Sequence, residues 1–82
     1  MNKMECVKTI LQTLTDLDAR RVTMTATEDH RAVQQVYDEC MTMCKENGYV
    51  GRCADGLWFK AVRLRAINQG VHPDSPSYIW EG

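Results

Sequence analysis

The sequence predicts a small α+β domain built from two main helices and a β-hairpin. Apolar residues recur at helical spacing in two separate segments, and an Asp55-Gly56 pair lies between two runs rich in strand-forming residues. A chain of 82 residues has room for only one domain. A mainly α, three-helix arrangement is the alternative, because the second of those runs also fits a helix.

The first helix is expected over residues 3–18. One helical stripe holds its apolar residues, which are Met4, Val7, Ile10, Leu11, Leu14 and Leu17. In the next segment, residues 21–27, apolar residues alternate with threonine. This period of two favours a short strand or an extended link between the two helices.

The second helix is expected over residues 29–46. Thr25 and Glu28 have the spacing of a capping box, so the helix should begin close to them. Asn47-Gly48 follows the last turn and favours a left-handed helix end. A wide apolar stripe lies between these signals and consists of Val33, Val36, Tyr37, Cys40, Met41, Met43 and Cys44.

The β-hairpin is expected from residues 49–54 and 57–65, with Asp55-Gly56 as its two-residue turn. In the second run apolar residues alternate with Arg63 and Arg65, as in a strand. Trp58 and Phe59 would then point to opposite sides of the strand. A helix over residues 57–68, stopped by Gly70, is the competing interpretation. Residues 1–70 are expected to form the domain, and residues 71–82 an extended C-terminal tail.

The order of these elements resembles the winged-helix fold. Residues 43–50, Met-Cys-Lys-Glu-Asn-Gly-Tyr-Val, look like the end of a recognition helix, and residues 52–56, Arg-Cys-Ala-Asp-Gly, look like a wing turn. Residues 62–65, Val-Arg-Leu-Arg, together with Gly70, resemble the returning wing strand of MarR-type regulators and of small phage and bacterial winged-helix proteins. The resemblance is local to residues 40–70. Residues 19–26 show no helix before the recognition helix, and no dimerisation helix follows Gly70.

The resemblance implies a DNA-binding transcriptional regulator of phage or mobile-element type. Its recognition helix would enter the major groove of double-stranded DNA, and its wing would contact phosphates. The candidate DNA-binding residues are Thr27, His30, Arg31, Gln34 and Gln35 on the helix, and Arg52, Lys60, Arg63 and Arg65 on the wing. Residues 49–70 hold four basic residues and one acidic residue, a net +3, which favours phosphate contact. Glu28 and Asp29 act either as helix caps or as groups that repel phosphate.

A protein-binding inhibitor or adaptor, phage-encoded and acting on a host protein or defence complex, is the alternative function. The near-neutral net charge of −1 and the five methionines suit a protein partner better than a nucleic-acid coat. The candidate partner-binding residues are Trp58, Phe59, Tyr78 and Trp80. A homodimer is also possible, because a domain of this size buries little surface by itself and association with a second copy would add to its stability.

The four cysteines, Cys6, Cys40, Cys44 and Cys53, are expected to be reduced core thiols in the cytoplasm. Cys40 and Cys44 with Cys53, His30 or His72 would make only an irregular zinc set, so neither a metal nor a cofactor is expected. Nothing in the sequence has the surroundings of a catalytic nucleophile, paired carboxylates or a phosphate loop, so no enzyme is expected. No apolar stretch approaches the roughly 18 residues of a membrane span, and no signal segment is visible.

Overall fold

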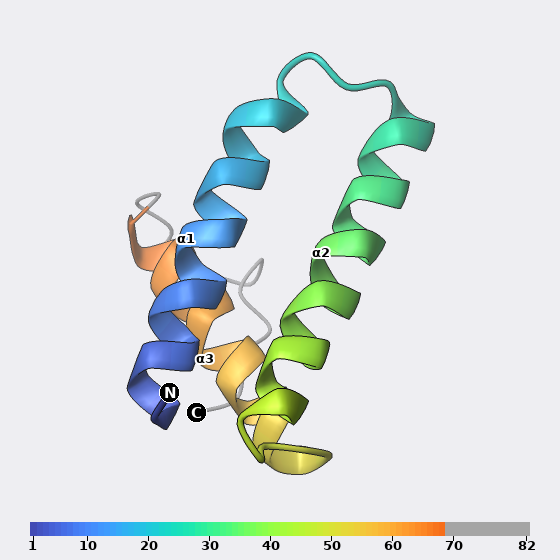
Figure 1. Cartoon of the computed structure of the whole chain (residues 1–82). Helices are drawn as coiled ribbons and strands as arrows, with labels where there is room; N and C mark the ends of the chain where they lie inside the picture. The colour runs from blue at the N-terminus through green and yellow to red at the C-terminus, as the bar shows by residue number, and fades with distance from the viewer. Residues whose placement is uncertain (69–82) are drawn as a thin grey trace.

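The computed structural model describes residues 1–68, which form three helices joined by two short loops. They are α1 (Lys3–Arg21), α2 (Ala26–Glu46) and α3 (Arg52–Asn68). Residues 1–68 contain no strand, so the predicted α+β fold with a β-hairpin is wrong, and the three-helix alternative describes this part of the chain. α1 and α2 form an antiparallel pair, and α3 crosses behind α1 (Figure 1). The C-terminal segment 71–82 predicted as a tail lies outside the described residues.

α1 begins at a capping box that was not predicted from the sequence. The Asn2 side chain accepts a hydrogen bond from the Glu5 backbone N–H at 2.8 Å, and the Glu5 carboxylate accepts one from the Asn2 backbone N–H at 2.8 Å. These two bonds satisfy backbone donors that a helix start leaves unpaired. The predicted helix is confirmed and extends to Arg21. Met4, which was placed on the apolar stripe, is 47% exposed.

Of the short strand or extended link predicted over residues 21–27, the strand is wrong, and the connection between the helices is shorter than expected. Arg21 ends α1, residues 22–25 form the connection, and Ala26 begins α2. The Thr25 hydroxyl accepts a hydrogen bond from the Glu28 N–H at 3.2 Å, and the Glu28 carboxylate accepts one from the Thr25 N–H at 3.1 Å. The threonine therefore caps a helix, and this local hydrogen bonding replaces the strand that the alternating pattern favoured. The predicted capping box is confirmed.

The end of α2 also matches its prediction. Gly48 has a φ of +87°, which favours glycine because a side chain would crowd the backbone there. The N–H of Gly48 donates to the carbonyl of Lys45 at 3.0 Å, and the N–H of Tyr49 donates to the carbonyl of Cys44 at 2.9 Å. These bonds satisfy the last carbonyls of the helix and turn the chain towards α3.

α3 occupies the segment that was predicted to be the β-hairpin. Gly51, with a φ of +58°, turns the chain just before the helix, and Asp55-Gly56 lies within the first two helical turns. Ala54, Leu57 and Ala61 are buried, at the i, i+3 and i+7 spacing of a helix face. A glycine inside a helix costs about 1 kcal/mol, which is less than the burial of such a face contributes.

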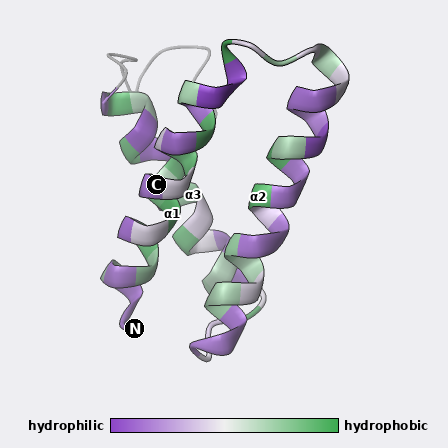
Figure 2. Ribbon diagram, turned by 45° about the horizontal axis from the view of Figure 1, so that its top comes forward, coloured by the Kyte–Doolittle hydropathy of each residue, from purple (hydrophilic) through white to green (hydrophobic). Residues whose placement is uncertain are grey.

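The core lies where the three helices converge, towards the end of α2. Hydrophobic residues follow the sides of the helices that face one another, whereas the first half of α2 is mostly hydrophilic (Figure 2). The buried residues are Cys6, Val7, Ile10, Leu14 and Leu17 of α1, Val36, Cys40 and Cys44 of α2, and Ala54, Leu57 and Ala61 of α3. α2 contributes no buried residue before Val36, so its first turns extend beyond the core.

Candidate functional site

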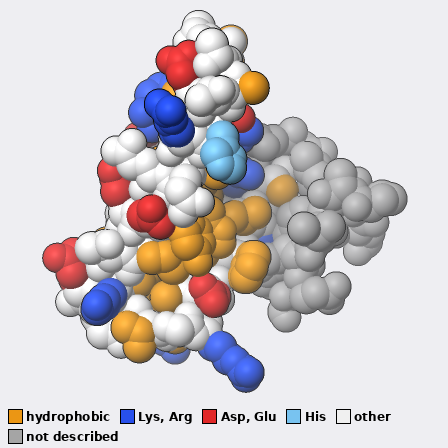
Figure 3. Space-filling model, turned by 90° about the vertical axis from the view of Figure 1, so that its right-hand side faces the viewer, with side chains coloured by type: hydrophobic (Ala, Val, Ile, Leu, Met, Phe, Trp, Pro, Cys, Tyr) orange, Lys and Arg blue, Asp and Glu red, His pale blue; other side chains and the backbone are white. Residues whose placement is uncertain are grey.

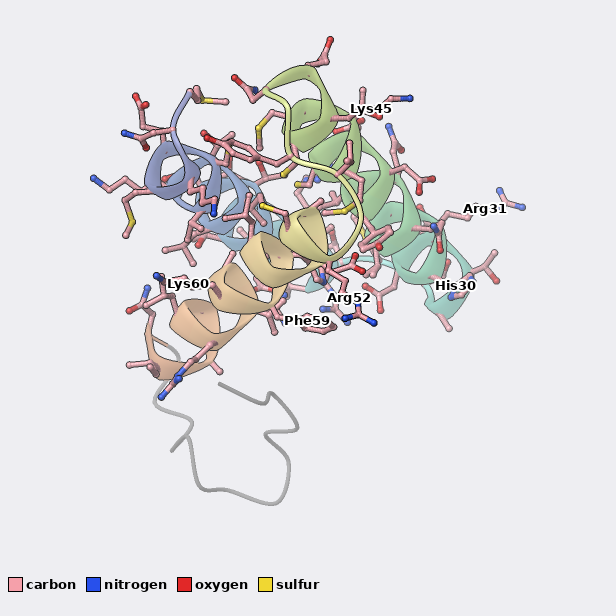
Figure 4. The ribbon with its side chains drawn as sticks, turned by 90° about the horizontal axis from the view of Figure 1, so that it is seen from below. His30, Arg31, Lys45, Arg52, Phe59 and Lys60 are labelled. Atoms are coloured by element: carbon pink, nitrogen blue, oxygen red, sulfur yellow. The ribbon has the colours of Figure 1, made fainter. Side chains whose placement is uncertain are left out.

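The residues expected to read DNA bases lie on the first turns of α2. Thr27, His30, Arg31, Gln34 and Gln35 are all exposed there. His30 and Arg31 point away from α1 and α3 (Figure 4). The side-chain amide of Gln34 donates to the Asp38 carboxylate at 3.1 Å, and that of Gln35 donates to the Glu39 carboxylate at 3.0 Å. Both amides are therefore paired with acids one turn further along the same helix.

The two acids at the start of α2 have local partners. The backbone and hydroxyl of Thr25 hydrogen-bond to Glu28 and lower the pKa of its carboxyl, so Glu28 stays ionised. The Arg21 guanidinium contacts both carboxylate oxygens of Asp29, with an Nη2–Oδ2 distance of 3.0 Å. This bidentate pair joins the end of α1 to the start of α2. Of the alternatives left open above, Glu28 acts as a helix cap, and Asp29 is an ion-pair partner.

The basic residues expected on a wing are divided between two sides of α3. Arg52 and Lys60 are exposed, and Arg63 is half-buried. Arg65 turns towards α1, where its guanidinium lies 3.8 Å from the Asp18 carboxylate. Because successive helical residues are rotated by about 100°, Arg63 and Arg65 cannot share a face as they would on a strand. The structure therefore does not bring the four residues together as a wing would.

Aromatic side chains meet between α2 and α3. The rings of Tyr37 and Trp58 make an edge-to-face contact, with centroids 5.0 Å apart and planes at 84°. The Tyr37 hydroxyl donates to the Asp55 carboxylate at 3.4 Å. Partial burial, followed by the charge of Asp55, raises the pKa of Tyr37, so the hydroxyl remains a donor. The next residue, Phe59, is 51% exposed.

These rings belong to a larger apolar patch, here called the α2–α3 surface. Its residues are Val33, Tyr37 and Met41 of α2, and Trp58, Phe59 and Val62 of α3, and all except Phe59 are half-buried. Hydrophobic side chains form a continuous area on this side of the molecule (Figure 3). An open hollow next to it is lined by Met41, Lys45, Tyr49, Val50, Gly51, Ala54 and Asp55. A continuous apolar surface of this kind marks an interaction site more often than scattered apolar residues do.

Two members of this surface, Trp58 and Phe59, were predicted from the sequence to bind a partner, whereas Tyr37 was predicted only as part of the apolar stripe of α2. Neither of the two is in a strand. Trp58 packs on Tyr37, whereas Phe59 is exposed because it lies about 100° further around the same helix. The width of the predicted apolar stripe on α2 was the sequence feature that could have indicated that Tyr37 lies partly at the surface. Val33, Tyr37 and Met41 form a second row beside Val36, Cys40 and Cys44, and one neighbouring helix cannot cover both rows. Tyr78 and Trp80 lie outside the described residues.

Charge is distributed unequally between α2 and α3. α3 holds four basic residues and one acidic residue, a net +3, and α2 holds two basic and five acidic residues, a net −3. The one acid of α3, Asp55, already accepts the Tyr37 hydroxyl. Arg52 and Phe59 point to the same side of α3, and Lys60 lies on its other flank (Figure 4). Arg52 therefore lies beside Phe59, the most exposed aromatic ring of the described residues, whereas Lys60 points away from it.

The cysteines lie in the core as free thiols. Cys6, Cys40 and Cys44 are buried, and Cys53 is half-buried. Burial, together with the neighbouring thiols of Cys6 and Cys53, raises the pKa of Cys44. Burial also raises the pKa of Cys40 to about 11. Thiols of this kind react poorly because the thiolate is the nucleophile. Within residues 1–68, no three side chains of the metal-ligating types are placed to hold a metal ion.

The raised pKa of Cys40 predicts a loss of stability in base. The thiol ionises near 9 in the unfolded chain and near 11 in the folded protein, so the folded state retains a proton that the unfolded chain releases. The stabilisation is complete below pH 9 and is lost as the pH rises towards 11. Urea unfolding at pH 8 and pH 10.5 should show that Cys40→Ala loses about 1–2 kcal/mol less over this interval than the wild type does. Parallel losses in the two proteins would contradict the prediction.

Comparisons with protein-family models, with curated proteins and with solved structures gave no match. None of the three described helices combines the length and the apolar character needed to cross a bilayer. A functional assignment must therefore rest on the surfaces of the molecule itself.

Proposed function

We propose that this protein is a protein-binding module that docks on a partner protein through the α2–α3 surface, as an adaptor or inhibitor does. The main support for this proposal is the exposure of the Phe59 ring beside the Tyr37–Trp58 pair. Protein interfaces concentrate their binding energy in a few large side chains, often aromatic, at the centre of a patch that excludes water.

Duplex DNA binding has less support from the same geometry. The amides of Gln34 and Gln35 are hydrogen-bonded to carboxylates, and those carboxylates would face the phosphates of a docked duplex. The basic residues of α3 are not arranged on a wing next to α2. A non-specific duplex complex depends on several phosphate contacts from one continuous basic surface.

Site-specific photo-crosslinking tests the proposal. A benzophenone amino acid replaces Phe59 in one protein and exposed Thr15 of α1 in a control, and both are irradiated in nuclease-treated lysate of the source cells. We expect a discrete protein adduct from position 59 and none from position 15. Unlabelled wild-type protein should compete for the adduct, and Phe59→Ala should compete at least about tenfold less well. A substitution at a half-exposed residue should leave the circular dichroism spectrum unchanged.

Duplex DNA binding is measured on the same proteins. A fluorescent pool of random 30-base-pair duplexes is titrated at about 50 and 200 mM salt. The proposal predicts no salt-sensitive binding in the micromolar range. Tight binding that weakens steeply with salt and falls in Arg31→Ala and Arg52→Ala, with no protein adduct at position 59, would overturn it in favour of a DNA-binding function.

A further inference from the structure

The α2–α3 surface lies close to the place where the described residues end. Phe59 and Asn68 are nine residues apart on α3, which corresponds to about 14 Å along the helix axis. Residues 69–82 follow directly on Asn68 and lie outside the described residues. The helix that carries Trp58 and Phe59 therefore leads straight into this segment.

The sequence of residues 69–82 contains one group of large apolar residues. Tyr78, Ile79 and Trp80 are consecutive, and Tyr78 and Trp80 are the only aromatic residues after Phe59. Aromatic and aliphatic side chains of this kind fill the centres of apolar interfaces. On the α2–α3 surface the exposed ring of Phe59 lies beside half-buried Trp58, which packs on Tyr37. The segment therefore carries the residue types that would cover this surface.

The chain between α3 and this apolar group is long enough for the group to return to the surface. Residues 69–77 separate Asn68 from Tyr78, and ten residue steps of extended chain span up to about 33 Å. This reach is more than twice the distance of about 14 Å from Asn68 back to the level of Phe59. Gly70, two residues beyond α3, favours the turn that such a return requires.

The covalent connection favours this segment over a second copy of the chain as the occupant. A tethered group meets a nearby surface at an effective concentration on the order of millimolar, whereas a second copy offers its surface only at the concentration of the protein. We propose that Tyr78, Ile79 and Trp80 dock on the α2–α3 surface of their own chain and compete there with the partner protein. This inference rests on the proposed function, because the docked segment would regulate the same site.

Intrachain crosslinking tests the docking in the purified 82-residue protein. The benzophenone amino acid is placed at position 59, and unlabelled protein is mixed with an equal amount of ¹⁵N-labelled protein before irradiation. Trypsin cuts after Arg52, Lys60 and Arg65, so it releases position 59 in peptide 53–60 and the apolar group in peptide 66–82. We expect mass spectrometry to find these two peptides joined within unlabelled chains and within labelled chains, but not between them.

Two variants and one control position define the contact. Tyr78→Ala/Trp80→Ala should reduce the joined peptides about tenfold or more, whereas Tyr78→Phe/Trp80→Phe keeps both rings and should retain most of them. Benzophenone at position 31 is the matched control, because Arg31 is exposed on α2 and points away from α1 and α3 (Figure 4). It should give no adduct with peptide 66–82. An unchanged circular dichroism spectrum shows that each variant is folded.

Competition with the partner is measured in the lysate experiment. Tyr78→Ala/Trp80→Ala should raise the yield of the partner adduct at position 59 about threefold or more, because the surface is then open in a larger fraction of the molecules. A synthetic peptide of residues 69–82, added in excess, should lower the yield from this variant again.

Four outcomes would overturn the inference. The first is the absence of joined peptides 53–60 and 66–82. The second is a set of adducts between unlabelled and labelled chains, which would make a second copy the occupant. The third is an adduct with peptide 66–82 that is equal at positions 59 and 31 or unchanged by Tyr78→Ala/Trp80→Ala, which would show chance encounters without docking. The fourth is an unchanged yield of the partner adduct in that variant, which would show that the segment does not compete.

Failure of the inference is distinguishable from failure of the proposed function. A partner adduct at position 59 without joined peptides would leave the protein-binding function intact and reject docking of the segment. Joined peptides without any protein adduct, both in the wild-type segment and in Tyr78→Ala/Trp80→Ala, would reject the proposed function and retain the docking.

Discussion

Ile10→Ala should destabilise the protein by about 3 kcal/mol. Ile10 is fully buried at the centre of the α1 stripe, between buried residues one turn before it and one turn after it. The substitution removes three carbon atoms from water-free surroundings and leaves a cavity that close-packed neighbours fill only in part. A domain of this size has a total stability of only about 4–12 kcal/mol, so the loss is a large part of it.

Thermal and urea unfolding followed by circular dichroism measure the effect. A loss of about 3 kcal/mol lowers the melting temperature of a domain this small by roughly 10–20 °C. Ile67→Ala is the matched control, because Ile67 is 44% exposed in the last turn of α3 and the chemical change is the same. Its effect should stay near 0.5 kcal/mol. Equal losses from the two substitutions would show that Ile10 does not lie in the core as described.

The first two helices were predictable because their signals are local. The apolar stripe of α1 and the two ends of α2 depend on residues within one or two turns of one another. Thr25, Glu28 and Gly48 each make the backbone contacts that their residue types favour. The short strand was wrong because threonines that alternate with apolar residues fit either a strand or the start of a helix. The Thr25 hydroxyl caps α2 and accepts a hydrogen bond from a backbone N–H, whereas a strand with no neighbouring strand would leave its backbone N–H groups unpaired.

α3 was predicted wrongly because its outcome depends on packing against α1. Asp55-Gly56 and the alternation around Arg63 and Arg65 both favour a hairpin locally. The helical period of Ala54, Leu57 and Ala61 was present in the sequence, but two of these residues are alanines and carry little weight in a hydrophobic pattern. Their importance appears only when α1 lies close by and the small side chains allow the approach. A partner distant in the sequence therefore decided between two local structures.

The candidate site was predictable in composition but not in arrangement. Trp58 and Phe59 were expected to contact a partner, and their chemistry remains the basis of the proposed function. The assignment of Arg63 and Arg65 to one face of a wing depended on a strand, in which residues two positions apart lie on the same side. In the helix, Arg65 faces Asp18, and Arg52 lies beside Phe59. Tyr37 belongs to the candidate site because the helical α3 places the Trp58 ring against the Tyr37 ring.

Ala61→Leu should destabilise the protein by about 2–3 kcal/mol, although leucine is the more hydrophobic residue. Ala61 is fully buried, and Ala54, seven residues earlier on the same face of α3, is buried as well. These two small side chains let α3 approach the rest of the core closely. A leucine adds three carbon atoms where close packing leaves no space, so α3 must move outwards or the side chain must leave its preferred rotamer.

Urea unfolding separates this steric effect from helix propensity. Ala19→Leu is the matched control, because Ala19 is exposed in α1 and leucine is nearly as good a helix former as alanine. Its effect should stay within about 0.5 kcal/mol. The hairpin predicted from the sequence gives the opposite expectation at position 61, since leucine forms strands better than alanine does and a sheet face would accept it. A stabilising Ala61→Leu substitution would therefore contradict the close packing of α3, whereas a loss confined to position 61 would support the helix and its alanine face together.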